Sequence, residues 1–217
     1  MDKDRVVRFS GSARFAHWGH TVTFLVLLFT GLILFSPAVG RVLAPVFGGY
    51  VNASTIHKVM AVFFTIIPLI ALVINFRGFL DWWKDVFSFG KNDIKFLMKF
   101  PLEFFGFKVD LPPQSKFNGG EKMNSVITTT SCVLLALSGY VMWFKDAFSP
   151  TLVQWAYPIH GICMILATCM VCMHAYLGSF HPGSGESFWG MWKGTVRSDW
   201  AAHHHAKWYE EVTKSQN

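Results

Sequence analysis

The chain has 217 residues, of which 52% are hydrophobic and 17% aromatic, whereas only 15% are charged. This composition argues against an ordinary soluble domain and is typical of a membrane protein with aromatic belts at both interfaces. The net charge of +6 does not indicate binding to nucleic acid, because the basic residues are not clustered on one polar face. We expect a single integral-membrane domain over residues 1–217.

Four apolar runs predict transmembrane helices at about 15–36, 55–76, 123–144 and 152–180. Pro37 marks the end of the first run, and Pro68 inside the second is tolerable because neighbouring helices can satisfy the released carbonyl. The fold class is therefore all-α, a four-transmembrane-helix bundle. The first run is too long for the h-region of a cleavable signal peptide, so none is expected.

The longest polar stretch, residues 77–122, separates the second and third runs. It contains F-L-D-W-W-K-D-V-F, whose mixed aromatic and charged residues predict a short helix lying in the membrane interface on the cytoplasmic side. Pro-Pro at 112–113 and Asn-Gly-Gly at 118–120 indicate irregular backbone before the third run.

The distribution of Lys and Arg predicts the orientation. The N-terminal segment carries four, the loop 77–122 eight and the C-terminal segment four, sixteen in all, whereas only Arg41, Lys58 and Lys145 fall on the other side. By the positive-inside rule, both termini and the long loop are cytoplasmic, in the cell (inner) membrane.

Two histidines, His160 and His174, lie in the last apolar run, fourteen positions apart. Fourteen steps of about 100° fall about 40° short of four turns, so both imidazoles point to nearly the same side of one helix. They are separated by about 21 Å along the axis. Histidines inside a membrane are costly unless they coordinate, pair or line a wet path, so each is a candidate functional residue. The alternative for each is a core histidine satisfied by a neighbouring hydroxyl or carbonyl.

His17 and His57 complete two pairs when depth in the membrane is assigned. His17 lies with His174 towards the inner face, and His57 lies with His160 towards the outer face. Two imidazoles from facing helices can fill both axial positions of a haem iron. Zinc is the competing metal, but it prefers four ligands in a tetrahedron.

Two questions about these ligands stay open: the identity of the inner ligand and the role of two glycines. His20, three residues after His17, is the alternative inner ligand. Gly31 and Gly139 could let a porphyrin edge approach the backbone, although small residues in membrane helices are more often packing devices.

The cysteines and the remaining histidines are assigned no chemical role. No C-x-x-C-H motif is present, which argues against covalently attached haem, and the pair Cys169 and Cys172 is interpreted as packing. His181 lies beyond the spans, and His203 to His205 are interpreted as surface residues without a ligand role.

Several short motifs occur in one order along the chain. They are R-F-A-H-W at 14–18, I-H at 56–57, K-F-N-G-G-E-K at 116–122, I-H at 159–160, H-A-Y at 174–176 and G-x-V-x-x-x-W-A-x-x-H-H-x-x-W-Y at 194–209. The set resembles the gamma subunit, a cytochrome b, of membrane-bound respiratory formate dehydrogenase, over nearly the whole chain. The sequence departs from that pattern at His20, Gly119 and Glu121.

The resemblance implies a dihaem b-type cytochrome, with an outer haem on His57 and His160 and an inner haem on His17 and His174. It implies an iron–sulfur subunit on the outer face and a catalytic subunit with a molybdenum or tungsten pterin. Menaquinone or another quinone would be reduced near Asn118 and Gly120. The chain itself would then not act on formate.

Two other functions stay open at this stage. The related cytochrome b subunits of nickel–iron hydrogenases and thiosulfate reductases share four helices and haem-ligating histidines. In a different class, a haem-free membrane anchor or a transporter would use the histidines to line a proton path. Counting b-type haems distinguishes a cytochrome b from a haem-free anchor or transporter. The identity of copurifying subunits distinguishes formate dehydrogenase from hydrogenase or thiosulfate reductase.

Overall fold

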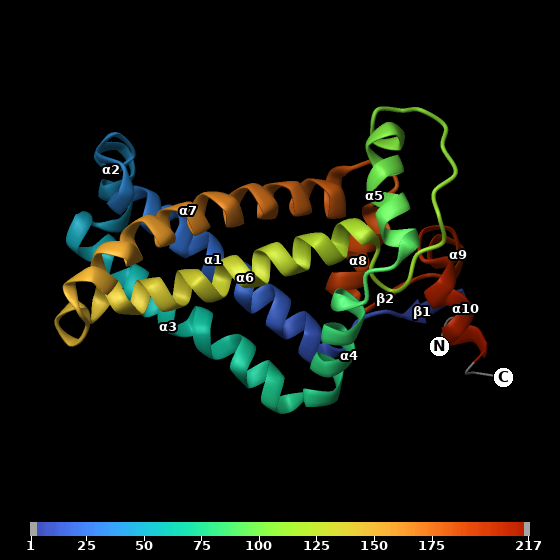
Figure 1. Ribbon diagram of the computed structural model, residues 1–217, viewed down its shortest axis with the longest axis horizontal. Helices are drawn as coiled ribbons and strands as arrows, with labels where there is room; N and C mark the ends of the chain where they lie inside the picture. The colour runs from blue at the N-terminus through green and yellow to red at the C-terminus, as the bar shows by residue number, and fades with distance from the viewer. Residues whose placement is uncertain (1–3, 215–217) are drawn as a thin grey trace. The chain divides into compact units, whose positions relative to one another are not determined.

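The computed structural model describes residues 4–214, most of which are helical (Figure 1). The helices are α1 (Gly11–Phe35), α2 (Pro37–Leu43), α3 (Tyr50–Ile74), α4 (Phe76–Phe87), α5 (Lys91–Phe104), α6 (Gly119–Trp143), α7 (Pro150–Ala175), α8 (Gly185–Lys193), α9 (Ser198–His204) and α10 (Ala206–Lys214). Two strands, β1 (Arg5–Val7) and β2 (Thr195–Arg197), and three short turns of helix, η1 (Ala44–Phe47), η2 (Lys145–Ala147) and η3 (Tyr176–Phe180), complete the described chain.

Four of these helices are long and apolar enough to cross a membrane, which confirms the all-α fold with four spans. They are α1, α3, α6 and α7, the last continued by the π-helical turn η3 to Phe180. Each begins two to five residues before the predicted start. For α1, α6 and α7 the reason is local, because each begins after a polar residue whose side chain caps it and not at its first apolar residue. Ser10 accepts from the backbone N–H of Ala13, for example, and so opens α1 well before the apolar run.

The described chain divides into two compact units. The bundle unit comprises residues 15–76 and 130–169, and the terminal unit comprises residues 4–14, 77–129 and 170–214. Three of the spanning helices pass from one unit into the other, because α1, α6 and α7 each contain a unit boundary.

In the bundle unit, the four spanning helices contact one another. The Tyr140 hydroxyl on α6 lies 3.1 Å from the Thr65 hydroxyl on α3. Gly161 on α7 faces the Phe35 ring of α1. Ile33 packs with Ala44 and Ala53 in a small core that closes one end of the unit. Figure 1 shows α1, α3, α6 and α7 as long ribbons.

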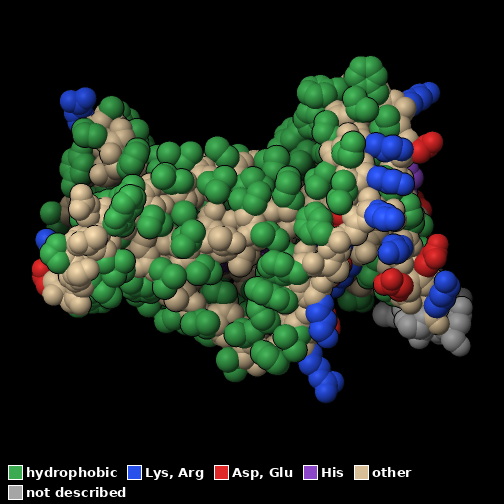
Figure 2. Space-filling model, in the orientation of Figure 1, with side chains coloured by type: hydrophobic (Ala, Val, Ile, Leu, Met, Phe, Trp, Pro, Cys, Tyr) green, Lys and Arg blue, Asp and Glu red, His purple; other side chains and the backbone are tan. Residues whose placement is uncertain are grey.

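The surfaces of these helices are apolar where a soluble protein would be polar. Val73 is 83% exposed and Ile162 is 65% exposed, and many other large apolar side chains of the spans are exposed as well. Hydrophobic side chains cover the visible faces of the long helices in Figure 2. An apolar surface of this extent is the part of the molecule that hydrocarbon covers. The chain is an integral membrane protein.

The terminal unit joins the two ends of the chain. Strand β1 pairs antiparallel with β2, with Val6 opposite Val196. Both valines belong to a buried cluster with Ala201 and Trp208. Gly194 ends α8 at a φ of 91°, and its carbonyl accepts from the backbone N–H groups of the residues that follow β1.

The long loop is more helical than the sequence analysis predicted. Helix α4 contains the predicted F-L-D-W-W-K-D-V-F helix. Helix α5 was not predicted, because Lys91 to Phe104 has charges on several sides and a proline inside. On α5, Phe96, Phe100 and Phe104 form an aromatic ladder, and the Phe104 ring stacks on His181 with ring centres 5.3 Å apart. That α4 lies in the membrane interface stays a prediction.

Candidate functional site: a histidine pair in the bundle and a capped loop

The structure brings two of the four predicted ligands together. His57 on α3 and His160 on α7 face each other inside the bundle unit, with ring centres 6.4 Å apart and ring planes at 63°. The two residues are 103 positions apart, so only the packing of α3 against α7, the second and fourth spans, places them at one depth. The depth argument predicted this pair.

Each of these imidazoles is held by a hydroxyl from a neighbouring helix. His57 Nδ1 lies 2.9 Å from Thr30 Oγ1, and His160 Nδ1 lies 3.0 Å from Ser138 Oγ. Thr30 and Ser138 are both buried, at 0% and 6% exposure.

The hydroxyl protons decide which nitrogen of each histidine is available. Thr30 donates its proton to the carbonyl of Val26 at 2.7 Å, and Ser138 donates to the carbonyl of Leu134 at 2.6 Å. Each oxygen therefore accepts from its histidine, so Nδ1 carries the hydrogen and Nε2 keeps its lone pair. In metal-ligating histidines, the ring nitrogen that does not bind the metal usually donates to such a hydrogen-bond partner, which fixes the tautomer and the ring orientation.

A glycine follows each hydroxyl residue and makes room for the ring. A Cβ built on Gly31 would lie 3.3 Å from His57 Cε1, and one on Gly139 would lie 3.2 Å from His160 Cε1. Both contacts are tighter than nearly all that real Cβ atoms make. The two glycines thus accommodate the imidazoles themselves, and a role towards a porphyrin edge stays a prediction.

The other two predicted ligands are distributed over both units. His17 lies on α1 in the bundle unit, with its ring edge-on to Trp18, and His174 lies near the end of α7 in the terminal unit. His20 stacks on the Phe64 ring at 4.0 Å between centres, and its buried Nδ1 has no hydrogen-bond partner in the described part of the chain. The pairing of His17 with His174, and the choice of His17 over His20, stay predictions.

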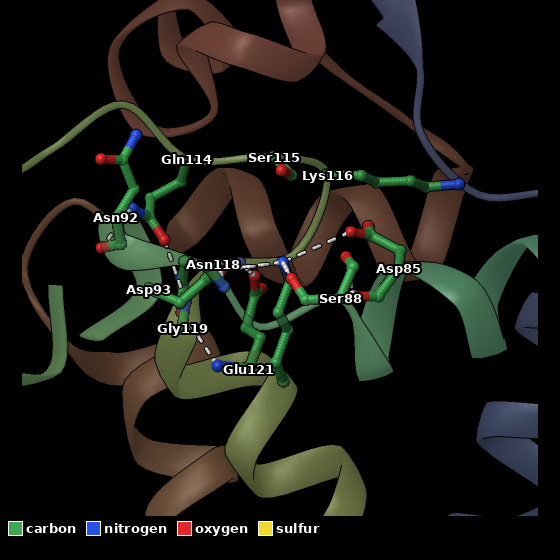
Figure 3. A network of polar contacts seen from close by, with 12 residues as sticks. Asp85, Ser88, Asn92, Asp93, Gln114, Ser115, Lys116, Asn118, Gly119 and Glu121 are labelled. Carbon is green, nitrogen blue, oxygen red and sulfur yellow. Dashed lines mark hydrogen bonds and ion pairs between the residues drawn. The ribbon is translucent and has the colours of Figure 1, made fainter. Parts of the chain in front are cut away.

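The Asn-Gly-Gly segment forms the cap of α6. Asn118 Oδ1 accepts from the backbone N–H of Glu121 at 2.9 Å, and a Glu121 carboxylate oxygen accepts from the backbone N–H of Asn118 at 2.8 Å. This reciprocal pair is a capping box. Gly119 donates to Gln114 Oε1, and a Cβ at Gly119 would lie 2.6 Å from the carbonyl oxygen of Asp93. Figure 3 shows these residues converging from the loop and from α5.

Glu121 is further tied to the N-terminal segment. The Arg8 guanidinium donates to its carboxylate at 3.1 Å and to the Lys116 carbonyl at 2.9 Å, and Arg8 is only 3% exposed. An electrostatic interaction also connects Glu121 with His174. Burial, aided by the Arg8 charge, lowers the pKa of Lys116 below its usual range.

Lys122, the next residue, is buried in a second ion-pair group. Its ammonium lies 3.2 Å from Asp93 and 3.5 Å from Asp85, and it donates to the Ser88 carbonyl at 3.1 Å. The side chain of Lys122 is 1% exposed. Burial raises the pKa of Asp85, although the Lys122 charge opposes that shift. These contacts tie α4 and α5 to the first turn of α6 (Figure 3).

Comparison with known proteins identifies the family. A family model described as prokaryotic cytochrome b561 matches residues 8–194. The chain belongs to this cytochrome b family. Over its full length it is 26% identical to the cytochrome b556(Fdn) subunit of the nitrate-inducible formate dehydrogenase of Escherichia coli K12, covering 96% of that protein.

Two further relatives carry similar names. The cytochrome b556 subunit of the formate dehydrogenase of Haemophilus influenzae is 27% identical over 98% of this chain and 85% of its own length. The cytochrome b556(fdo) subunit of Escherichia coli K12 is 23% identical over 98% of this chain and 96% of its own length.

The family implies haem b as the cofactor, and the outer histidine pair fits it. An imidazole nitrogen binds a metal at about 2 Å, and bonds of about 1.33 Å give the ring a radius of about 1.1 Å. Two imidazoles on one iron therefore have ring centres about 6 Å apart. The observed 6.4 Å between His57 and His160, together with two available Nε2 atoms, matches that requirement. No group of three or more His, Cys, Asp or Glu side chains suited to a metal occurs among residues 4–214, so the described structure offers zinc no such site.

The C-terminal histidines differ from one another, and the surface interpretation was wrong for one of them. His203 and His204 are exposed, whereas His205 is 1% exposed and its Nδ1 lies 2.8 Å from the Ser115 carbonyl. Burial, aided by the Arg8 charge, lowers the pKa of His205 to about 4. His205 therefore stays neutral and attaches the tail to the loop before α6.

Sequence reasoning missed the partners of the predicted site. Thr30-Gly31 and Ser138-Gly139 repeat one dipeptide pattern, a hydroxyl followed by glycine, which was a usable signal. Asn118 and Glu121 have the spacing of a capping box, which was also readable. Nothing local indicated that Arg8 or Lys122 would be buried, because their partners lie 113 and 29 residues away.

Proposed function

We propose that this cytochrome b is the dihaem membrane subunit of a formate dehydrogenase complex and carries electrons across the membrane to a quinone. The observation that carries the proposal is the pair His57 and His160, facing each other at 6.4 Å with both Nδ1 atoms bound to buried hydroxyls. The names of the relatives, which match this chain from end to end, support formate dehydrogenase as the complex.

The chain's own residues would hold two haems at two depths. His57 and His160 provide both axial nitrogens of the outer one, and His17 and His174 provide those of the inner one. Haem iron, when bound, supplies one-electron transfer, with a potential set by its axial ligands and their outer partners. Thr30 and Ser138 keep the outer imidazoles in the tautomer that presents Nε2.

The partners follow from the same proposal. An iron–sulfur subunit would dock at the outer face and deliver electrons there, and a molybdenum- or tungsten-pterin subunit would oxidise formate. The chain has no role in formate chemistry in this scheme. Sixteen basic residues on the loop and terminal side support cytoplasmic termini.

The quinone would bind near Asn118 and Gly120, on the inner side. The capping box occupies Asn118 Oδ1 and leaves the Nδ2 amide, a donor, outside the cap. That amide can donate to a quinone carbonyl oxygen. A Cβ on Gly120 would lie 3.2 Å from Asn118 Oδ1. The absence of a side chain at Gly120 therefore leaves room for the Asn118 side chain in its capping position.

Haem counting in the purified complex tests the first part. We expect two b-type haems per chain by pyridine haemochrome assay. His57→Ala and His160→Ala should each leave one haem, because the inner ligands come from the other depth. Loss of both haems from a variant that still inserts and folds would contradict the pairing.

Alanine variants of His17 and His20 test which of the two histidines binds the inner haem. His17→Ala should remove the inner haem, whereas His20→Ala should retain two. The opposite result would move the ligand by one helical turn.

The quinone contact is tested by a variant that keeps the cap. Asn118→Ser retains an oxygen that can accept from the Glu121 N–H but removes the amide donor. Reoxidation of the haems by a menaquinone analogue should slow, with haem content and stability unchanged. Normal reoxidation in Asn118→Ser, combined with defects only in Asn118→Ala, would restrict Asn118 to capping.

Copurification decides the complex. Formate dehydrogenase subunits in the purified material support the proposal, whereas hydrogenase or thiosulfate reductase subunits would replace formate as the electron donor.

A further inference from the structure

Helix α5 connects the start of one span with the end of the next. At its first turn, a Cβ added at Gly119 of α6 would lie 2.6 Å from the Asp93 carbonyl oxygen. At its last turn, the Phe104 ring lies edge-on to Tyr176 of η3 and stacks on His181, which directly follows η3. All five residues belong to the terminal unit, so α5 is held at both ends within one compact unit.

These two contacts determine the direction of α5. The start of α6 and the end of η3 lie at the same side of the membrane, because α6 and α7 are consecutive spans and η3 continues α7. Asp93 and Phe104 are eleven residues apart, which is about 16 Å along a helix axis. A helix that reaches from one span end to the other runs along the membrane surface and not across the bilayer.

The side of α5 away from these contacts carries an apolar row. Ile94, Met98 and Leu102 are all exposed, Met98 at 72%, and they repeat every four residues, so they lie on one face of the helix. Phe105, directly after α5, is 75% exposed. An apolar surface rimmed by polar residues marks a face that another molecule covers.

A lysine row runs beside the apolar row. Lys91, Lys95 and Lys99 are exposed and also repeat every four residues. Among residues 4–214, none of the three forms an ion pair. Figure 2 shows a row of basic side chains at the place of α5, with hydrophobic side chains beside it. The charges of this row are therefore available to an anionic partner.

The chemistry of the two rows selects the partner. A helix in the membrane plane with an apolar stripe and lysines beside it is typical of helices that lie at a lipid surface. The alkyl stems of the lysines cover apolar surface, while their ammonium groups reach the depth of the lipid phosphates. A second copy of this chain docked by the same face would bring two lysine rows together, and like charges across an interface oppose association.

We propose that the exposed face of α5 is a binding surface for anionic phospholipids of the adjacent membrane leaflet. The apolar row enters the acyl boundary, and the lysine row binds the headgroup phosphates. The bound lipid would also support the start of α6, because α5 holds Asp93 against Gly119 and Lys122. The inference depends neither on the number of haems nor on the electron donor.

Quenching of a fluorescent probe by labelled lipids tests the proposal at this site. Met98→Cys, in a background without the four native cysteines, carries the probe in the purified complex. The complex is reconstituted in phosphatidylcholine vesicles with a few per cent of nitroxide-labelled phosphatidylglycerol or phosphatidylcholine, the nitroxide lying near the top of the acyl chain. Both labelled lipids should quench the probe, and phosphatidylglycerol should quench it more strongly at equal content.

The preference for phosphatidylglycerol should depend on the lysine row. Lys91→Gln with Lys95→Gln should lower it by about fivefold or more, because each lysine near an anionic surface strengthens binding by about that factor. Lys207→Gln with Lys214→Gln removes the same charge from exposed positions on α10 and should leave it unchanged. A probe at Ile162→Cys, exposed on the span α7, should be quenched without a preference. Elution of each variant as the full complex in size-exclusion chromatography shows that it folds.

Three results would overturn the proposal. The first is a probe at Met98→Cys that neither lipid quenches. The second is a preference for phosphatidylglycerol that is absent, or that survives Lys91→Gln with Lys95→Gln. The third is cross-linking of Met98→Cys between two complexes in the vesicles, which would assign the face to a second copy of the chain.

Discussion

At the scale of single residues, the outer site depends on small side chains beside large ones. His57 and His160 are held by Thr30 and Ser138 at 2.9 and 3.0 Å. Gly31 and Gly139 leave the space that each ring occupies. The four spanning helices thus each provide one part of this arrangement.

Gly139→Val should therefore release the outer haem. A Cβ added at this position would lie 3.2 Å from the His160 ring. The two methyl groups of valine would then displace the imidazole. We expect loss of one haem by pyridine haemochrome assay, with the inner haem retained.

Gly161→Val is the matched control for this change. Among residues 4–214, a Cβ added at Gly161 would meet the Phe35 ring alone, at an ordinary contact distance of 3.6 Å. Retention of two haems in Gly139→Val would show that the glycine does not shape the site.

At the scale of elements, the start of α6 is fastened from several sides. Asn118 and Glu121 cap it, Arg8 binds Glu121, and Lys122 binds α4 and α5 through Asp85 and Asp93. A buried ion pair of this kind is weak evidence for net stability, but removing one partner leaves a buried charge.

Lys122→Met should destabilise the terminal unit by about 3–5 kcal/mol, because Asp93 stays buried without its counter-ion. Thermal unfolding in detergent measures the effect. The double variant Lys122→Met with Asp93→Asn should recover part of the loss, since the amide still accepts from the Gly90 N–H that Asp93 now caps. Equal stability of the single and double variants would contradict the charge argument.

The attachment of the C-terminal tail should depend on pH through His205. Its pKa is about 4 in the folded protein and about 6.5 when unfolded, so the unfolded state binds the proton first. Stability is full above about pH 6.5 and falls as pH drops towards about 4, by about 3 kcal/mol in total.

Hydrogen exchange of residues 195–214 at pH 7 and pH 5 measures this effect. His205→Gln should abolish the contribution of this residue to the pH dependence, whereas His203→Gln, at an exposed position two residues away, should not. An unchanged pH response in His205→Gln would assign the effect to other groups.

At the scale of the whole molecule, most basic residues lie outside the four spans, whereas the spans expose apolar side chains. Sixteen of the nineteen Lys and Arg residues precede, follow or lie between the spans on one side. The apolar helices carry large exposed side chains, which a membrane covers.

The orientation is testable with single cysteines in a background without the four native ones. Arg41→Cys should react with an impermeant maleimide in intact spheroplasts, because the charge distribution predicts that its loop lies outside. Lys95→Cys, exposed on α5, should react only after permeabilisation. The reverse pattern would invert the topology and move the inner haem to the outer side.

The sequence alone determined the features that follow from local periodicity. The four spans were readable because a helix crossing hydrocarbon must be apolar over about 20 residues. Helix geometry likewise predicts the shared stripe of His160 and His174, and the count of charges predicts the orientation. These inferences need no knowledge of which helix lies beside which.

Only the tertiary structure decided what each side chain contacts. Thr30 became the partner of His57, Arg8 was buried against Glu121, and β1 paired with β2 across 190 residues. His205 was buried although its neighbours are exposed. Such contacts join segments that are distant in sequence, and a hydroxyl or an arginine has the same local pattern whether it faces solvent, lipid or a buried partner. Their identity is fixed by packing, which requires each buried polar group to find a partner in three dimensions.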